Sequence, residues 1–272
     1  MTSKREREVV TTRQRVVQAA EAALVSPEEL DRALVLGQIA YFLTQHRRIG
    51  RRVAFKGGAV MKLLDASPRF SGDLDGVAVT GKPIEQRWIE EALWANPEAA
   101  RVFLAKPRIV NATDRGISYP IVECRAVGSG RNPITVKLSI NWSERLELDP
   151  LWRHLKVHGV GHAVKIPTVD DRERAAEKVR ACLDRADVND AFDLNHFAAR
   201  GWKRDDWNLV ARLVPIKLQN STIKPGTNLL ARFDQQLAVV KAVWPGDMVV
   251  AGGAPAWAAV EGGVLRFRDL LS

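Results

Sequence analysis

The pattern of apolar and polar residues predicts a long helix near the start of the chain. This helix is expected to begin at Ser26, whose hydroxyl can accept free backbone N–H groups, with Pro27 at the first helical position and acidic residues in the first turn. Apolar residues then recur at helical spacing as far as Leu43, and Gly50 follows the end. One face of the helix is therefore expected to pack on the core.

Short strands and further helices are expected to follow this helix. Glycine and proline punctuate the segment at Gly57, Gly58 and Pro68. A turn-rich stretch over residues 128–133 separates two alternating runs, which is the signal of a β-hairpin. The expected order is strand 52–55, helix 59–64, strand 74–79, helix 84–96, and strands 108–110, 117–127 and 134–142.

The chain changes character beyond residue 150. A short β-prone segment ends at Pro167, and the later patterns have helical periodicity. We therefore expect two domains, an α+β domain with N-terminal helices over residues 1–145 and a mainly helical domain over residues 146–272. The helices after Pro167 are expected over residues 170–185, 189–200, 205–218, 228–244 and 264–271.

One segment combines two features that bear on chemistry. Gly57 and Gly58 lie where a strand turns into a helix, so their backbone can approach a ligand closely and the helix N-terminus can present free N–H groups to a phosphate. Lys56 adds a cation at the same place. Asp73 and Asp75 alternate on the next strand, so both carboxylates project from one face and can hold a divalent cation between them.

Each of these features has a plainer interpretation when it is taken alone. A glycine pair before a helix is commonly a tight turn, and two aspartates at a strand end commonly form a solvated edge. In the order strand, Gly-Gly, helix, Ser-x-Asp-x-Asp, strand they instead make up the parts of a metal–triphosphate site. Nucleotidyl transfer with two metal ions needs such parts, because one cation activates the attacking hydroxyl and the other neutralises the leaving pyrophosphate.

The composition agrees with a globular protein that binds an anion. Hydrophobic residues make up 46% and charged residues 27% of the 272 positions, which excludes a disordered or fibrous chain. Lysine and arginine number 41 against 32 acidic residues, and the charge of +9 favours a polyanionic partner. The basic surface is interpreted either as a solvated face or as a lining for RNA phosphates. Its residues are Arg47, Arg48, Arg51, Arg52 and Lys56, with Lys203, Arg204, Arg212, Lys217 and Lys224 in the helical half.

Other features bear on location and on further ligands. Cys124 and Cys182 form no metal or redox motif, so both are expected to be core residues of a protein in a reducing compartment. The N-terminus lacks the apolar stretch of a secretory signal, and no run approaches the roughly 20 apolar residues of a membrane span. We therefore expect a cytoplasmic protein without membrane contact. His154, His158 and His162 are evenly spaced, but the glycines between them favour strand and turn over a metal site.

The same glycines and aspartates carry a resemblance to a known family. Together with a second group of residues in the helical half, they resemble the motifs of the AbiEii/MenT nucleotidyltransferase toxins, the toxin halves of type IV bacterial toxin–antitoxin pairs. The similarity covers roughly residues 30 to 200 in element order. The matching positions are Lys56, Gly57, Gly58, Arg69, Ser71, Asp73 and Asp75 in the first motif, and Glu177, Lys178, Arg185, Asp190, Asp193 and Leu194 in the second.

The resemblance implies a fold and a set of site residues. The fold is α+β, a DNA polymerase β-like nucleotidyltransferase core with a mixed or antiparallel sheet, followed by an all-α C-terminal domain that completes the active-site cleft. Asp73 and Asp75 would bind Mg²⁺ or Mn²⁺. Catalytic roles are implied for Ser71, Asp73, Lys178 and Asp193. Nucleotide binding is implied for Lys56, Gly57, Gly58, Arg69, Ser71, Lys178, Arg185 and Asp190.

The resemblance also implies an activity and partners. The expected reaction transfers a nucleoside monophosphate from an NTP to RNA, with the 3′ end of tRNA as the acceptor and pyrophosphate as the leaving group. Blocking that end would prevent aminoacylation and stop translation. A cognate antitoxin protein would control the activity.

One position departs from the general fold pattern. The fold places a third carboxylate on a later antiparallel strand, where this sequence has Lys137 and Ser139. Glu123 or Asp193 could supply the missing base, or the reaction proceeds without a dedicated base. Two alternatives to the RNA-directed enzyme stay open on this account: a nucleotidyl- or phosphotransferase that acts on a protein or small molecule, and a catalytically impaired module that binds nucleotide or RNA.

Overall fold

The structure is a computed structural model that describes residues 4–96, 99–114, 117–126, 132–157, 163–219 and 221–271. It divides into two compact units, which we describe one at a time. The first unit is Met1–Arg145, Pro150–Thr168 and Val249–Gly252, and the second is Leu146–Asp149, Val169–Met248 and Gly253–Ser272.

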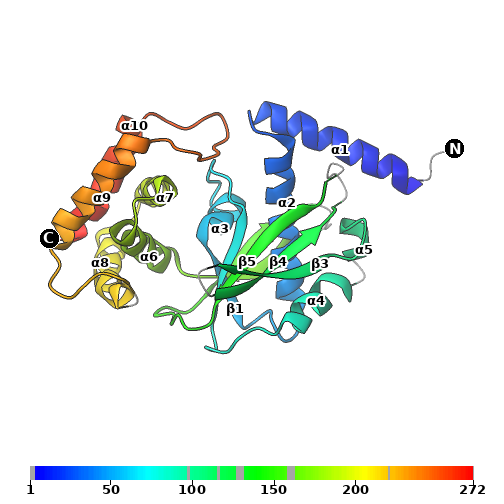
Figure 1. Cartoon of the computed structure of the whole chain (residues 1–272), viewed down its shortest axis with the longest axis horizontal. Coiled ribbons are helices and arrows are strands. Elements are labelled where there is room, and N and C mark those ends of the chain that lie inside the picture. Colours follow the sequence, from blue (N-terminus) through cyan, green and yellow to red (C-terminus); the bar gives the residue numbers. More distant parts are fainter. Residues whose placement is uncertain are drawn as a thin grey trace. The chain divides into compact units, whose positions relative to one another are not determined.

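The first unit is built on a mixed sheet (Figure 1), in which the described residues form the strand order β3-β4-β5-β2-β1-β7-β6. β1 pairs with β2 in antiparallel fashion and with β7 in parallel, while β2 and β5 are parallel neighbours. The antiparallel hairpin expected between the fourth and fifth of the predicted strands, around residues 128–133, is confirmed as β4 and β5. The strands are β1 (Val53–Lys56), β2 (Asp73–Ala78), β3 (Arg108–Asp114), β4 (Ile117–Cys124), β5 (Ile134–Asn141), β6 (Leu151–Lys156) and β7 (Ala163–Thr168).

Helix α2 packs against this sheet and contacts β2, β5 and β7. It begins as predicted, because the Ser26 hydroxyl accepts the backbone N–H of Glu29 at 3.2 Å. The segment before it, which is rich in charged residues, forms helix α1, for which the sequence analysis gave no bounds. Helix α1 packs on α2 and is fixed to it by an ion pair between Arg13 and Asp31. The helices of this unit are α1 (Lys4–Ala22), α2 (Pro27–Gln45), α3 (Gly57–Leu64), α4 (Gln86–Trp94) and α5 (Ala99–Val102).

The two faces of the central strands differ in polarity. Leu74 and Leu138, which lie side by side on β2 and β5, belong to the buried core. Because neighbouring residues of a strand point to opposite faces, Asp73 and Asp75 project from the other face together with Lys137. At this end of β2 and β5 one face of the sheet is therefore apolar and buried, and the other has charged side chains.

The hairpin of β6 and β7 extends the sheet of the first unit, although the predicted boundary at residues 145 and 146 assigned it to the helical domain. The reason is that Thr168 of β7 pairs with Phe55 of β1. Leu155 and Ile166 then continue the core. No periodicity within a short strand shows which distant strand it pairs with, so the pattern alone left this attachment open.

The second unit is helical, as predicted for the C-terminal region. The last of its long helices begins earlier than expected, because Gly262 and Gly263 lie inside it instead of ending it. A side chain at Gly263 would come closer than 3.0 Å to the Asn195 amide, so the glycine allows α7 and α10 to approach. The helices are α6 (Asp171–Asp184), α7 (Val188–Ala198), α8 (Arg204–Leu218), α9 (Leu229–Val243), α10 (Trp257–Arg268) and η1 (Asp269–Leu271).

None of the helices in the described ranges has the length and apolar run that crossing a membrane requires. Both cysteines are buried free thiols, in agreement with their expected core role. Burial raises the pKa of the Cys124 thiol to about 12, so this thiol stays protonated at neutral pH. The histidine series is not fully described, since His158 and His162 lie outside the described residues.

Candidate active site

Gly57 fixes the junction between β1 and α3. Its φ of +74° lies in the left-handed region, where glycine is favoured. A side chain at this position would come closer than 3.0 Å to Oδ2 of Asp75. The absence of a side chain at Gly57 therefore lets the Asp75 carboxylate lie against the start of α3.

Gly58 makes room for two further residues of the first motif. A methyl group at Gly58 would overlap the Arg69 guanidinium and reach 3.0 Å from the Ser71 hydroxyl oxygen. Arg69 is 7% exposed and donates to the carbonyl oxygen of Phe70 at 3.2 Å. The Ser71 hydroxyl donates to the Asp73 carbonyl oxygen at 3.3 Å. The structure thus brings Arg69 and Ser71 to the turn formed by Gly57 and Gly58, which we call the glycine turn.

Asp73 and Asp75 lie on one face of β2, as their spacing predicted. On the parallel neighbour β5, Lys137 pairs with Asp73 and Ser139 pairs with Asp75. In the stretch where a third carboxylate was expected, β5 therefore has a lysine beside Asp73 and a serine beside Asp75. Asp73 is an exposed residue, but its carboxyl group is partly desolvated, and this desolvation raises its pKa above 3.8. The charges of Lys137 and Arg32 lower the pKa but do not outweigh the desolvation.

These two carboxylates fit a magnesium ion better than a cation that needs a full protein cage. No group of three or more acidic, histidine or cysteine residues suited to a metal ion occurs in the part of the chain that is described. Mg²⁺ is commonly held by one or two carboxylates, with water and substrate phosphates in its remaining positions. Asp73 and Asp75 match that ligand set in number and type.

Glu144, a residue that the sequence analysis missed, lies next to Lys56, directly before the Gly57–Gly58 turn. The Lys56 ammonium forms an ion pair with Oε2 of Glu144 at 2.6 Å, and Asn141 donates its side-chain N–H to that oxygen at 3.3 Å. Lys56 also pairs with Asp75 across β1 and β2, so these two side chains share a face. The turn at Asn141 was visible in the sequence as an Asn that can accept following backbone N–H groups, but nothing local indicated that Glu144 meets Lys56.

Glu123, one of the expected substitutes for the strand carboxylate, has a different neighbour. It lies on β4 opposite Arg108 and forms an ion pair with it at 3.3 Å. Its partner on β5 is Thr135, two positions before Lys137. The structure therefore does not bring Glu123 into register with Asp73.

The second motif forms a cluster within the helical unit. Lys178 on α6 contacts Asp190 and Asp193 on α7, each at 2.8 Å. Both aspartates are fully buried, whereas the lysine side chain keeps 17% of its surface exposed. Lys178 therefore lies at the edge of a buried acidic pair.

Arg185 completes this cluster by donating to Asp190 at 2.9 Å. Burial by itself would raise the pKa of Asp190, but the charges and hydrogen bonds of Lys178 and Arg185 outweigh it and hold the pKa at about 2. Asp190 is thus an ionised, buried carboxylate between two cations. The Arg185 side chain is 62% exposed and can also meet an anion in solvent.

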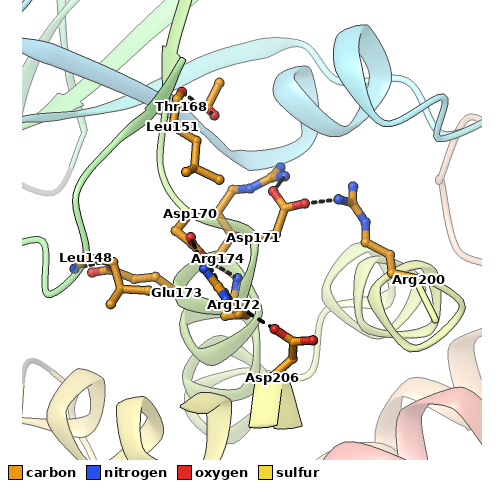
Figure 2. A network of polar contacts seen from close by, with 10 residues as sticks. All are labelled: Leu148, Leu151, Thr168, Asp170, Asp171, Arg172, Glu173, Arg174, Arg200 and Asp206. Atoms are coloured by element: carbon orange, nitrogen blue, oxygen red, sulfur yellow. Dashed lines mark hydrogen bonds and ion pairs between the residues drawn. The ribbon is translucent and has the colours of Figure 1, made fainter. Parts of the chain in front are cut away.

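A network of ion pairs holds α6, the helix that carries Lys178 (Figure 2). Asp170 caps α6 and accepts from the Arg172 side chain, which also reaches Asp206 at the start of α8. Asp171 pairs with Arg174 and with Arg200, which follows α7. The first turn of α6 is therefore fixed against its neighbours within the helical unit.

Buried charges extend this network along α6. Glu173 is fully buried, accepts the backbone N–H groups of Glu147 and Leu148, and pairs with Lys217 of α8 at 2.5 Å. Glu177, part of the second motif, contacts the same lysine at 3.4 Å. Lys217 is therefore structural, although the sequence analysis counted it among the basic surface residues.

The two tryptophans among the basic residues of the helical half pack on one another and on phenylalanines. Trp202 stacks on Phe197 and meets Trp207 edge-on, and Trp207 packs on Phe267. Both indoles are half-buried in this aromatic cluster.

A family model described as nucleotidyl transferase AbiEii toxin, type IV TA system, matches residues 41–248. The chain is similar to MenT4, a nucleotidyltransferase toxin from Mycobacterium tuberculosis, with a TM-score of 0.63 and 20% identity over 97% of this chain and 88% of that chain. It is also similar to a putative nucleotidyltransferase from Helicobacter pylori, with a TM-score of 0.55 and 16% identity over 91% and 94%. JHP933 from Helicobacter pylori matches with a TM-score of 0.53 and 16% identity over 90% and 91%.

At these identities the similar structures show the nucleotidyltransferase fold, and no curated protein sequence matches the chain. The family model, in contrast, spans most of the chain and includes both motifs. The chain therefore belongs to the AbiEii family of nucleotidyltransferase toxins of type IV toxin–antitoxin systems.

Proposed function

We propose that this toxin transfers a nucleoside monophosphate from an NTP to the 3′ end of tRNA and thereby blocks aminoacylation and translation. The acceptor hydroxyl oxygen forms a bond to the α-phosphorus of the NTP. The bond from that phosphorus to the oxygen that bridges to the β-phosphate breaks, and pyrophosphate leaves. Because β5 offers Lys137 and Ser139 in place of a strand carboxylate, the proposed route for the hydroxyl proton is transfer to water.

The observation that carries this proposal is the contact between Asp75 and the glycine turn. Gly57 places the start of α3 directly beside the Asp75 carboxylate. A phosphate bound by the free N–H groups of α3 would therefore lie next to Asp73 and Asp75. Those two carboxylates would hold Mg²⁺ or Mn²⁺, and the bound ion would neutralise charge on the phosphates.

Each remaining motif residue has a role that fits its surroundings. The Ser71 hydroxyl and the Arg69 guanidinium, both beside Gly58, would contact phosphate oxygens. Lys178 would bind the triphosphate from the helical domain, and Asp193 would hold its ammonium in place. Arg185 would add a second cation, with Asp190 as the carboxylate that orients both.

RNA is the acceptor class that the charge of the chain favours. A net charge of +9 raises the local concentration of a polyanion and speeds its association. As a type IV toxin, the protein also has a cognate antitoxin as a partner. Co-expression with that antitoxin should relieve the growth arrest that the toxin causes.

The test is a transfer assay with labelled nucleotides. The protein is incubated with each of the NTPs, labelled at the α- or the γ-phosphate, and with purified tRNA. We expect α-label on tRNA from at least one NTP and no γ-label. A matched tRNA whose 3′ diol has been oxidised with periodate should accept no label, because the attacking hydroxyl is gone.

Asp73→Asn is the matched inactive variant for this assay. Asp73 is exposed at the start of β2, so the amide should preserve the fold while it removes a metal ligand. We expect transfer to fall at least about a hundredfold. Label on protein or on a small molecule would favour the alternative transferases. If no acceptor is labelled by the wild type, the chain is a binding module.

A further inference from the structure

Four arginines lie on the turn that follows α2, at the end of β1 opposite to the glycine turn. The segment from His46 to Arg52 follows the helix and leads into β1 at Val53. Lys56 and Gly57 lie at the opposite end of that strand, about 10 Å away at the usual rise per residue. We call this segment the arginine turn; its four cations are Arg47, Arg48, Arg51 and Arg52.

The backbone of the arginine turn is fixed. Ile49 is fully buried in the core and anchors the middle of the turn. The backbone N–H groups of Ile49 and Gly50 donate to the His46 carbonyl oxygen at 2.9 and 2.8 Å. A side chain at Gly50 would collide with the Thr44 carbonyl oxygen, so the turn needs this glycine to close tightly. The arginines therefore project from a preorganised support.

No carboxylate lies within ion-pair distance of Arg47, Arg48 or Arg51 among the residues that the structure describes, and all three are exposed. The acidic residue next to the turn, Glu91, contacts His46 instead. Four like charges held this close repel one another. A bound anion would remove that repulsion.

The side chain of Trp88 on α4 organises two of these cations. The guanidinium of Arg48 lies 5.5 Å from the centre of its ring and that of Arg52 lies 5.0 Å from it. Because Trp88 is 8% exposed, the indole supports the arginines and is not itself available to a ligand. Guanidinium groups held in this way keep their planar donor fork, which matches the two oxygens of a phosphate.

We infer that the arginine turn binds the phosphate backbone of the acceptor RNA. This inference rests on the proposed function, since it concerns the RNA that the enzyme modifies. The arginine turn and the glycine turn lie at opposite ends of β1. A single ligand that contacts both turns therefore has to be an extended polyanion. Arginine forks match the oxygens of phosphates and of carboxylates alike, so an acidic polypeptide is the competing ligand that the test has to exclude.

The test compares two triple variants that remove the same charge. One is Arg47→Ala, Arg48→Ala and Arg51→Ala, and the control is Lys106→Ala, Arg108→Ala and Arg125→Ala, three exposed cations on and beside β3 and β4. Binding of labelled tRNA is measured at several salt concentrations. The affinity of the arginine-turn variant should fall at least about tenfold at 0.1 M salt, and the slope of log affinity against log salt should drop by about 2 to 3.

The outcomes separate the two proposals. Equal losses in the two triple variants would overturn the arginine turn as a site, and so would displacement of tRNA by polyglutamate at equal charge. A wild-type protein that neither binds nor labels tRNA would overturn the proposed function instead. If the triple variant melts early, the double variant Arg47→Ala, Arg51→Ala, which leaves both Trp88 contacts intact, replaces it, with an expected drop in slope of about 1 to 2.

Discussion

The ammonium of Lys56 lies 2.6 Å from Oε2 of Glu144, beside the turn where the triphosphate is proposed to bind. Both side chains are largely buried, with 16% and 14% of their surfaces exposed. A charged hydrogen bond in such a setting is stronger than one in water. A triphosphate that uses Lys56 therefore has to compete with Glu144.

Replacing Glu144 with glutamine should strengthen nucleotide binding. The variant Glu144→Gln keeps the size of the side chain and removes one negative charge from the site. We expect the dissociation constant for the NTP to fall about threefold to tenfold, which is about 1 kcal/mol. Isothermal titration of the protein with NTP measures this change.

The matched variant Lys56→Met should have the opposite effect and weaken NTP binding about tenfold, because it removes the cation itself. Weaker binding by Glu144→Gln would contradict the competition. Glu144 would then be a group that helps to hold the nucleotide.

Gly57→Ala should cost both stability and activity. The positive φ disfavours any side chain by about 1 to 2 kcal/mol, and the new methyl group would push the Asp75 carboxylate away. Gly81→Ala is the control, since Gly81 has a φ of +64° and its nearest neighbour is the Trp142 carbonyl oxygen at 3.9 Å. Urea unfolding and the transfer assay should show a larger stability loss in Gly57→Ala and a loss of transfer in that variant alone. Equal activity in the two variants would remove the role of the Gly57–Asp75 contact.

How much the sequence can predict follows from the range of the interactions. The Ser26 cap and the alternation of Asp73 and Asp75 depend on residues a few positions apart, so both were predictable. The Lys56–Glu144 pair joins residues 88 positions apart, and the attachment of β7 to β1 joins Phe55 to Thr168. Such contacts depend on tertiary packing, which the local pattern of apolar and polar residues does not show.

The helical motif illustrates the same limit on the candidate site. Its charged residues were identifiable by type and order. Asp190 and Asp193, three positions apart on α7, lie on one face of that helix and both contact Lys178. Whether a lysine is a surface cation or a buried partner was not identifiable, because Lys178 and Lys217 look alike in the sequence. Only the packing of α6 on α8 shows that Lys217 neutralises Glu173.

Lys178→Met should abolish transfer and also weaken the fold. It removes the ammonium that contacts Asp190 and Asp193, and breaking a buried ion pair costs about 3 to 5 kcal/mol. The double variant Lys178→Met, Asp193→Asn removes one of the two carboxylates and should recover part of that stability. Transfer should stay lost in both, since no cation is left at that position. Recovery of transfer in the double variant would show that Lys178 serves the fold alone.

Asp190→Asn should make the free energy of unfolding depend less on pH below about pH 4. The pKa of Asp190 is about 2 in the folded protein and 3.8 as its ordinary value, so the ionised form stabilises the fold above pH 3.8. That contribution, about 2 kcal/mol, is lost as the pH falls from about 4 to about 2. The free energy of unfolding of Asp190→Asn should therefore lie at least about 2 kcal/mol below that of the wild type at pH 7, and the difference should shrink toward pH 2.

The control for this pH dependence is Asp234→Asn. Asp234 also has a lowered pKa, caused mainly by its hydrogen bond from Arg268, but that pair lies on the surface. Solvent and salt screen an exposed ion pair, so its loss should change stability far less than the loss of Asp190. Urea unfolding of both variants at pH 7, 4 and 3 makes the comparison. Equal losses at pH 7 would mean that the two cations around Asp190 do no more than a surface pair, and that the cluster on α6 and α7 is not a preorganised part of the site.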